Sequence, residues 1–129
     1  MRQRPLSPHI GVYKFAYTMA TSIAHRATGI VLSVGLIALT YWLIAAASGP
    51  ASYASAVTLL GGGLGQFLIG GWLVAFSYHL LNGLRHLNWD LGRGLEKPEA
   101  RRSAALVVVA TLVLAGAFVY AAFFAGVPR

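Results

Sequence analysis

Two groups of polar residues with potential chemistry interrupt apolar stretches of this chain, and both contain histidine. The first consists of Ser22, His25 and Arg26. Residues three and four apart share one side of an α-helix, so these side chains lie along one helical side. A hydroxyl and a guanidinium both donate hydrogen bonds to carbonyl oxygens, which suits a neutral lipid such as a quinone. A snorkelling arginine, a capping serine and an interfacial histidine would give the same pattern, and this interpretation stays open.

The second group extends from His79 to Asp90. His79 and His86 are seven residues apart, hence on one helix face and about 10 Å apart along its axis, with the bare backbone of Gly83 between them. His79 lies about 16 Å from Asp90, near the middle of a membrane. Its depth, the adjacent glycine and the cations of Arg85 and His86 nearer the surface favour a metal porphyrin with anionic carboxylates.

Two alternatives to a porphyrin concern the same histidine. A buried imidazole that hydrogen-bonds to a neighbouring helix would also explain the depth of His79. A zinc or copper site is disfavoured, because this helix offers too few nitrogen, oxygen or sulfur ligands close together. Since His79 alone lies at the depth of an axial ligand, a haem with two histidine ligands would need the second from another chain.

The elements that must position these groups are membrane helices. Of the 129 residues, 57% are hydrophobic and only 10% are charged, and residues 27–84 and 103–128 contain no charged side chain. A span needs about 20 apolar residues, so the first stretch holds two spans and the second holds one. This excludes a soluble globular domain. We predict an all-α membrane protein with a single anchor domain, residues 1–129, comprising a polar arm over 1–20 and three transmembrane helices at about 21–47, 64–88 and 104–125.

The connections and the positive charges predict the topology. Residues 48–50 indicate a turn, residues 51–64 a loop and the early part of the second helix, and residues 90–102 a polar loop. Four positive residues precede the first apolar stretch, five lie between the end of that stretch and the third helix, none lies between the first two helices, and one ends the chain. Positive residues gather on the cytoplasmic side, so we expect a cytoplasmic N-terminus and an outer, periplasmic C-terminus.

Composition also bears on partners and location. The net charge is +7, but the positive side chains flank membrane spans. They therefore do not indicate a nucleic-acid partner. The chain has no cysteine, which excludes disulfides and iron–sulfur clusters held by this chain. Its beginning fits neither a cleavable signal nor a transit peptide. We therefore expect direct insertion among membrane lipids, which favours the bacterial inner membrane over the mitochondrial one.

Three stretches resemble the cytochrome b556 membrane-anchor subunits of succinate dehydrogenase, the larger of its two anchors. The chain opens with RPLSPH at residues 4–9, as that family does. Residues 22–29, SIAHRATG, fit its Ser-x-x-His-Arg-x-x-Gly element. Residues 79–90, HLLNGLRHLNWD, fit its His-x3-Gly-x-Arg-His-x-x-Trp-Asp element.

The resemblance implies a haem b shared by two anchor chains, with His79 as one axial ligand and the second histidine from the smaller anchor. It implies that Ser22 and Arg26 line a ubiquinone pocket. The residues expected near the haem propionates are His25, Arg26 and His86, and the supporting residues are Gly83, Arg85 and Asp90.

The expected partners are the second anchor, an iron–sulfur subunit and a flavoprotein subunit. Electrons would pass from succinate to ubiquinone, with no catalysis by this chain alone. One competing hypothesis is a haemless structural anchor or assembly scaffold that docks soluble redox subunits. A small transporter subunit is disfavoured, because residues 27–77 contain neither charged residues nor histidine.

Overall fold

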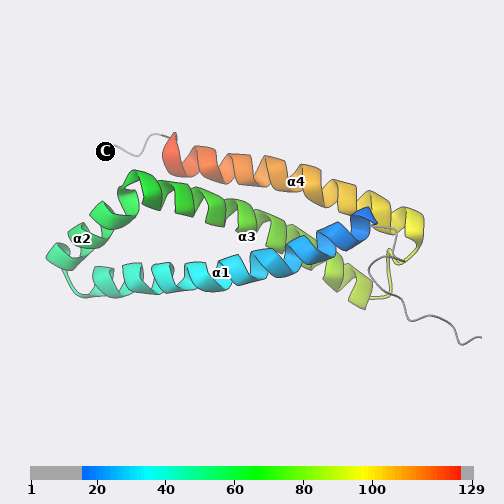
Figure 1. The fold of residues 1–129 in the computed structure, drawn as a ribbon, viewed down its shortest axis with the longest axis horizontal. Helices are drawn as coiled ribbons and strands as arrows, with labels where there is room; N and C mark the ends of the chain where they lie inside the picture. The colour runs from blue at the N-terminus through cyan, green and yellow to red at the C-terminus, as the bar shows by residue number, and fades with distance from the viewer. Residues whose placement is uncertain (1–15, 126–129) are drawn as a thin grey trace, which may run out of the picture.

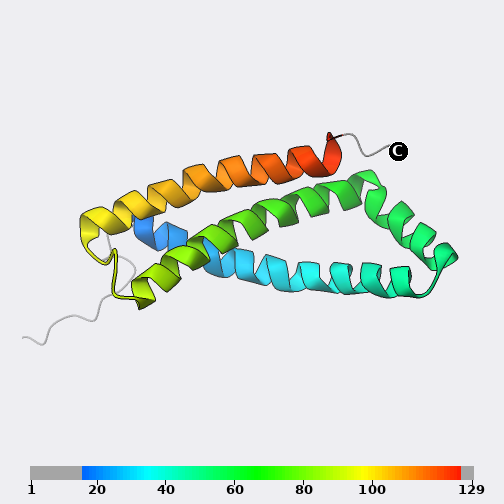
Figure 2. The ribbon, with the colours of Figure 1, turned by 180° about the vertical axis from the view of Figure 1, so that it is seen from behind.

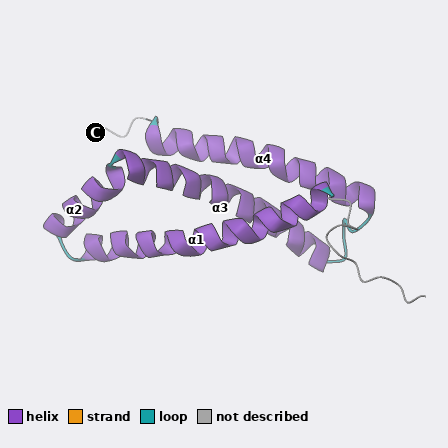
Figure 3. Cartoon of the chain, viewed as in Figure 1, coloured by secondary structure: helices purple, strands orange, loops and turns teal. Residues whose placement is uncertain are grey.

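The computed structural model describes residues 16–125, which form four helices (Figures 1 and 3). These are α1 (Tyr17–Ala47), α2 (Pro50–Gly61), α3 (Gly63–Asp90) and α4 (Lys97–Phe123). Helices α1, α3 and α4 are long and apolar enough to cross a membrane, which confirms the prediction of an all-α protein with three transmembrane helices. The stretch at residues 4–9 and the C-terminal arginine lie outside the described residues.

Helix α3 runs antiparallel to α1 and α4 and crosses α1 in both views (Figures 1 and 2). The beginning of α1, the end of α3 and the beginning of α4 therefore meet at one end of the molecule. We call this the histidine end and define it as residues 17–29, 77–90 and 97–104. The opposite end, where α2 connects α1 to α3, is the α2 end, defined as residues 35–75 and 111–125.

Helix α2 corrects the expectation that residues 51–64 form a loop and the early part of the second helix. Gly49 adopts φ 110°, which glycine tolerates, and Pro50 occupies the first turn, where its missing N–H is not needed. The helix ends at Gly61, and α3 begins two residues later. A Cβ at Gly65 would collide with the Leu60 backbone, so this sharp turn requires glycine there.

Two other helices begin earlier than the sequence indicated. Helix α1 starts at Tyr17 and not near residue 21, so the polar arm is shorter than 1–20. Helix α4 starts at Lys97 and not near residue 104. Pro98 in its first turn and the acidic Glu99 both favour a helix beginning, and the apolar pattern alone could not show this charged extension. The polar loop is thereby reduced to residues 91–96.

Small side chains occupy the helix contacts, whereas large apolar side chains face outward. Val107 is the largest of the buried apolar residues, and the others are Ala45, Ala56, Ala75, Ala104 and Ala115. Exposed residues include Ile37, Phe67 and Leu112, each about 70% accessible or more. Within a bilayer, small contact residues let helix backbones approach closely, and lipid or partner helices can cover the outward apolar surface.

Candidate functional site

Three histidine rings come together at the histidine end, although His25 is more than 50 residues before His79 and His86 in the sequence. The His25 ring on α1 stacks on the His79 ring of α3, with centroids 4.0 Å apart and ring planes 13° apart. The same His25 ring lies 5.1 Å from the ring of His86, which follows His79 by two turns of α3. The histidines of the two polar groups therefore form one cluster.

The hydrogen bonds of His79 define which of its ring nitrogens is available. Its Nδ1 lies 3.1 Å from the backbone oxygen of His25 and 3.3 Å from Oγ1 of Thr28. Within residues 16–125, no hydrogen bond involves Nε2 of His79. His79 thus hydrogen-bonds to a neighbouring helix, which was the alternative to a porphyrin ligand. It still has one ring nitrogen available for a ligand.

Glycines at this end let α1 and α3 approach. A Cβ at Gly29 would lie 3.1 Å from Cε1 of His79, tighter than an ordinary contact, so the bare backbone makes room for the imidazole. A Cβ at Gly83 would lie 3.8 Å from Cε1 of His25. The slot that we expected Gly83 to offer a flat ligand therefore faces the His25 ring in this chain.

Arg85 is buried and hydrogen-bonds to all three long helices. Its Nε donates to Ser103 Oγ at 3.0 Å and its Nη2 to the Ala100 oxygen at 2.9 Å, both on α4. Its Nη1 lies 3.3 Å from Thr21 Oγ1 on α1 and from Asn82 Oδ1 on α3. All four acceptors are uncharged, and they occupy most of the guanidinium donors. This geometry makes Arg85 a connection between helices.

The edge of the cluster nearest the end of α3 contains an aromatic side chain. The Trp89 ring meets the His86 ring edge-on, with centroids 5.0 Å apart. The guanidinium carbon of Arg85 lies 4.0 Å from the Trp89 ring centroid, a cation–π distance. Asp90, the next residue, is exposed. His86 is thus positioned by contacts with the rings of His25 and Trp89, whereas His79 is positioned by hydrogen bonds.

Ser22 and Arg26 lie beside the cluster and not within it. The Ser22 side chain is half-buried, and Arg26 is exposed. In the part of the chain that the structure describes, neither side chain forms a hydrogen bond. Toward the rest of the described residues, both keep their donors available one turn apart on α1.

Sequence reasoning missed four polar residues that connect the helices here. The Tyr78 hydroxyl donates to the Thr21 backbone oxygen at 2.7 Å, and Tyr17 donates to the Ala104 oxygen at 3.4 Å. Thr21 is buried, and Ser103 accepts from Arg85. Thr21 shares a helix face with His25 and Thr28, a spacing that could have revealed it.

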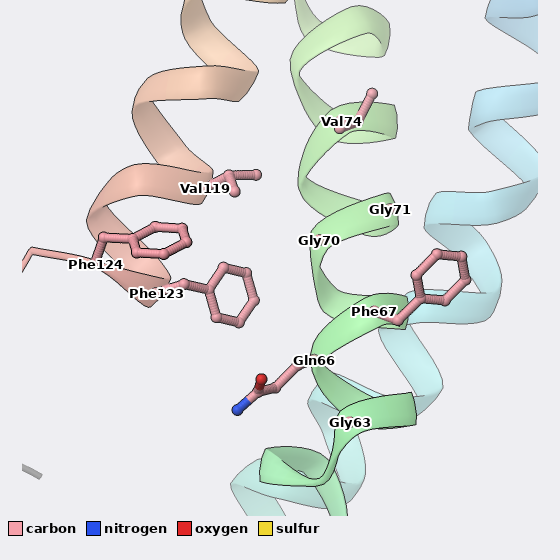
Figure 4. A pocket seen from close by; sticks show the side chains of 9 residues that line it. All are labelled: Gly63, Gln66, Phe67, Gly70, Gly71, Val74, Val119, Phe123 and Phe124. Atoms are coloured by element: carbon pink, nitrogen blue, oxygen red, sulfur yellow. The ribbon is translucent and has the colours of Figure 1, made fainter.

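A separate open cavity of about 570 Å³ lies at the α2 end, between the beginning of α3 and the end of α4 (Figure 4). Its lining is apolar apart from one amide, with side chains and backbone from Gly63, Gln66, Phe67, Gly70, Gly71, Val74, Val119, Phe123 and Phe124. The amide nitrogen of Gln66 donates to the Gly61 oxygen at 3.0 Å. This lining contains no ionisable side chain, so the cavity differs chemically from the histidine cluster.

Comparison with known proteins identifies relatives along most of the chain. Residues 1–118 match the family model described as the succinate dehydrogenase/fumarate reductase transmembrane subunit. The succinate dehydrogenase cytochrome b556 subunit of Paracoccus denitrificans is 42% identical over 112 residues, which cover 87% of this chain and 86% of the relative. The corresponding subunit of Rickettsia felis is 32% identical, with 87% of each chain covered.

Mitochondrial relatives are longer than this chain. The cytochrome b560 subunit of Sus scrofa is 41% identical over 117 residues, covering 85% of this chain and 66% of the relative. The family-model match over residues 1–118 includes all three stretches singled out in the sequence. With the histidine cluster and three spanning helices, these matches show that the chain belongs to the family of succinate dehydrogenase and fumarate reductase transmembrane subunits.

Proposed function

We propose that this chain is the anchor subunit of succinate dehydrogenase that binds haem b together with a second, smaller anchor chain and helps to form a ubiquinone site. The observation that carries the proposal is the arrangement of His79. Its Nδ1 lies at hydrogen-bond distance from a backbone carbonyl on α1, and its Nε2 makes no bond within the described residues. Histidines that ligate metals commonly use this arrangement.

The residues present fit a haem that takes one ligand from this chain. Among residues 16–125, no three His, Cys, Asp or Glu side chains are placed to hold a metal ion. An iron bound by His79 would therefore take its other ligands from a porphyrin and from the partner's histidine. One-electron transfer is the chemistry that a bound haem b supplies. His25, Arg26 and His86 would lie near its anionic propionates, with Gly83, Arg85 and Asp90 in support.

Ser22 and Arg26 would bind the quinone. Their donors have no partner within the described part of the chain, and they lie one turn apart on the α1 surface next to the histidine cluster. The hydroxyl and the guanidinium would orient the quinone carbonyl oxygens and stabilise negative charge on them during reduction.

The proposal also assigns orientation, location and partners. The positive charges at the N-terminus and after α3 favour a cytoplasmic histidine end, an outer C-terminus and insertion in a bacterial inner membrane. A flavoprotein subunit and an iron–sulfur subunit would deliver electrons from succinate at that side. This chain would bind and position the cofactor and the quinone, while succinate oxidation takes place on its partners.

A reduced-minus-oxidised spectrum of the purified complex tests the haem proposal. We expect a b-type α band in the wild type and its loss in His79→Ala, with a smaller change in the matched variant His86→Ala. A wild-type complex without the band would favour the haemless anchor. Loss of the band in His86→Ala alone would assign the ligand to the other histidine.

Quinone reduction tests the second half of the proposal. In Ser22→Ala and Arg26→Leu we expect slower ubiquinone reduction, with unchanged succinate oxidation by a soluble dye. The exposed Ser33 and Arg101 provide matched controls as Ser33→Ala and Arg101→Leu. Equal quinone turnover in the site variants and their controls would contradict the proposed pocket.

A further inference from the structure

We propose that three groups on α1, namely the His25 backbone oxygen, the Thr28 hydroxyl and the bare Cα of Gly29, form a cradle that fixes the orientation and tautomer of His79. The cradle leaves Nε2 of His79 without a hydrogen bond within the described residues, and Thr28 is a positioning residue within it. The effect on haem rests on the function proposed above, whereas the tautomer does not depend on it.

The position of the ring proton follows from the acceptors around Nδ1. A carbonyl oxygen can only accept a hydrogen bond, so the 3.1 Å contact between Nδ1 and the His25 oxygen requires the proton on Nδ1. A neutral imidazole has one N–H, which leaves Nε2 unprotonated with its lone pair available. His79 is thereby set as the tautomer that ligates through Nε2.

Thr28 reinforces this assignment. Its Oγ1 lies 2.9 Å from the backbone oxygens of Ala24 and of His25, so its single proton is donated to the α1 backbone. The hydroxyl oxygen then presents a lone pair to Nδ1 of His79, 3.3 Å away. Two acceptors on α1 thus share one N–H donor.

The ring is also confined sterically. Its Cε1 lies where only the bare backbone of Gly29 gives room, and the His25 ring covers one face at a centroid distance of 4.0 Å. A 180° flip of the His79 ring would put Cδ2 in place of Nδ1, lose both acceptors and turn Nε2 toward Gly29. The cradle therefore selects one ring orientation.

The cradle distinguishes the two α3 histidines. Within the described residues, His86 has ring contacts with His25 and Trp89 but no hydrogen bond at either nitrogen. Hydrogen bonding at Nδ1 raises the basicity of the opposite nitrogen and orients it toward a metal. By this criterion His79 is prepared as a ligand and His86 is not.

Nitrogen-15 NMR of the histidine-labelled, chemically reduced complex tests the cradle directly. We expect a one-bond proton coupling at Nδ1 of His79, identified by the signals that disappear in His79→Gln, and none at Nε2. A proton on Nε2 would overturn the proposal. This readout applies with or without haem, so a complex that lacks haem but shows the Nδ1 proton would refute the proposed function and leave the cradle standing.

Haem potentiometry tests the contribution of Thr28. Thr28→Val removes one acceptor, so the imidazole becomes a weaker donor to ferric iron and the haem midpoint potential should rise. Thr28→Ser should restore the wild-type potential. Thr40→Val is the matched control, because Thr40 makes the same bond to its own helix on an exposed face. Equal potentials in Thr28→Val and Thr40→Val would overturn the role of Thr28.

Gly29→Ala tests the steric part. The added Cβ forces the His79 ring to move by a few tenths of an ångström, which should shift the haem α band or its electron paramagnetic resonance signal. Gly116→Ala is the control, since a Cβ there meets nothing within 4 Å. An unchanged signal in Gly29→Ala would remove Gly29 from the cradle. If the Thr28→Val complex does not assemble, two measurements still test the cradle: the haem potential of Thr28→Ser and the position of the His79 ring proton in the wild type.

Discussion

The two ends of this molecule join their helices by different interactions. At the histidine end, hydrogen bonds from Tyr78, His79 and Arg85 connect α3 to its neighbours. At the α2 end, helices meet through small residues, and the Trp72 indole packs against the bare backbone of Gly35. Within the described residues, no side-chain hydrogen bond links α1, α3 and α4 at the α2 end.

The difference follows from the membrane as a solvent. Lipid tails are as apolar as the helix surfaces, so helices associate through close packing and interhelical hydrogen bonds. The chain uses close packing where only helix contact is needed. It concentrates polar groups, which are costly in a membrane, where the candidate site needs fixed positions. His79 and Arg85 therefore belong both to the candidate site and to the polar connections of the fold.

The largest expected effect comes from removing the central hydrogen-bonding residue of the histidine end. Arg85→Leu deletes four hydrogen bonds, each worth about 0.6–1 kcal/mol, so the free energy of unfolding should fall by about 2–4 kcal/mol. Detergent titration of the reconstituted complex measures it, with the exposed Arg101→Leu as control. Unchanged or higher stability would mean that burying the guanidinium costs as much as its bonds return.

The next effect tests close packing at the α2 end. Gly35→Ala places a Cβ in collision with the Trp72 indole, so we expect a loss of about 1–2 kcal/mol from forced repacking. The same unfolding titration measures it, and the haem spectrum should stay unchanged. In contrast, Gly116→Ala should be neutral or stabilising by up to about 1 kcal/mol, because a Cβ there is unobstructed. Equal effects at both glycines would contradict the packing argument.

A smaller effect belongs to one hydrogen bond at the histidine end. Tyr78→Phe removes the hydroxyl that donates to the Thr21 oxygen at 2.7 Å, and should cost about 0.6–1 kcal/mol in the free energy of unfolding. The exposed Tyr120→Phe should show no change when unfolded in parallel. A Tyr78→Phe variant as stable as this control would show that the bond contributes nothing net.

The smallest effect is expected at the polar residue of the α2 end. The exposed Gln66 amide donates to the Gly61 oxygen across the α2–α3 turn, so Gln66→Leu should change stability by no more than about 0.5 kcal/mol. Comparison of its unfolding midpoint with that of Tyr78→Phe measures the contrast between the ends. A larger loss in Gln66→Leu would show that hydrogen bonds also stabilise the α2 end.

Much of the architecture could be predicted from charge-free runs, because the length of a membrane span is set by the bilayer. The helix over Pro50–Gly61 could not, since its small residues carry no clear apolar period. The first turns of α4 were missed for a related reason: Lys97 and Arg101 look like loop residues, yet a helix can continue beyond the hydrocarbon.

The site was predictable in outline and not in its contacts. Orientation and spacing placed His25 and His79 at the same end, and the structure stacks their rings. The bonds from Tyr78 to Thr21 and from Arg85 to Ser103 depend on how each helix is rotated about its axis. Spacing within one helix does not determine that rotation. The same limit explains why Arg85 was expected near carboxylates but bonds to neutral acceptors.

The one-sided placement of interhelical hydrogen bonds has a consequence for motion. Helices joined near Arg85 can change tilt with displacements that grow with distance from it and are largest beside α2. Bilayers of different thickness favour different helix tilts. A tilt change that pivots near Arg85 would therefore alter the spacing between the His25 and His79 rings less than the helix spacing beside α2.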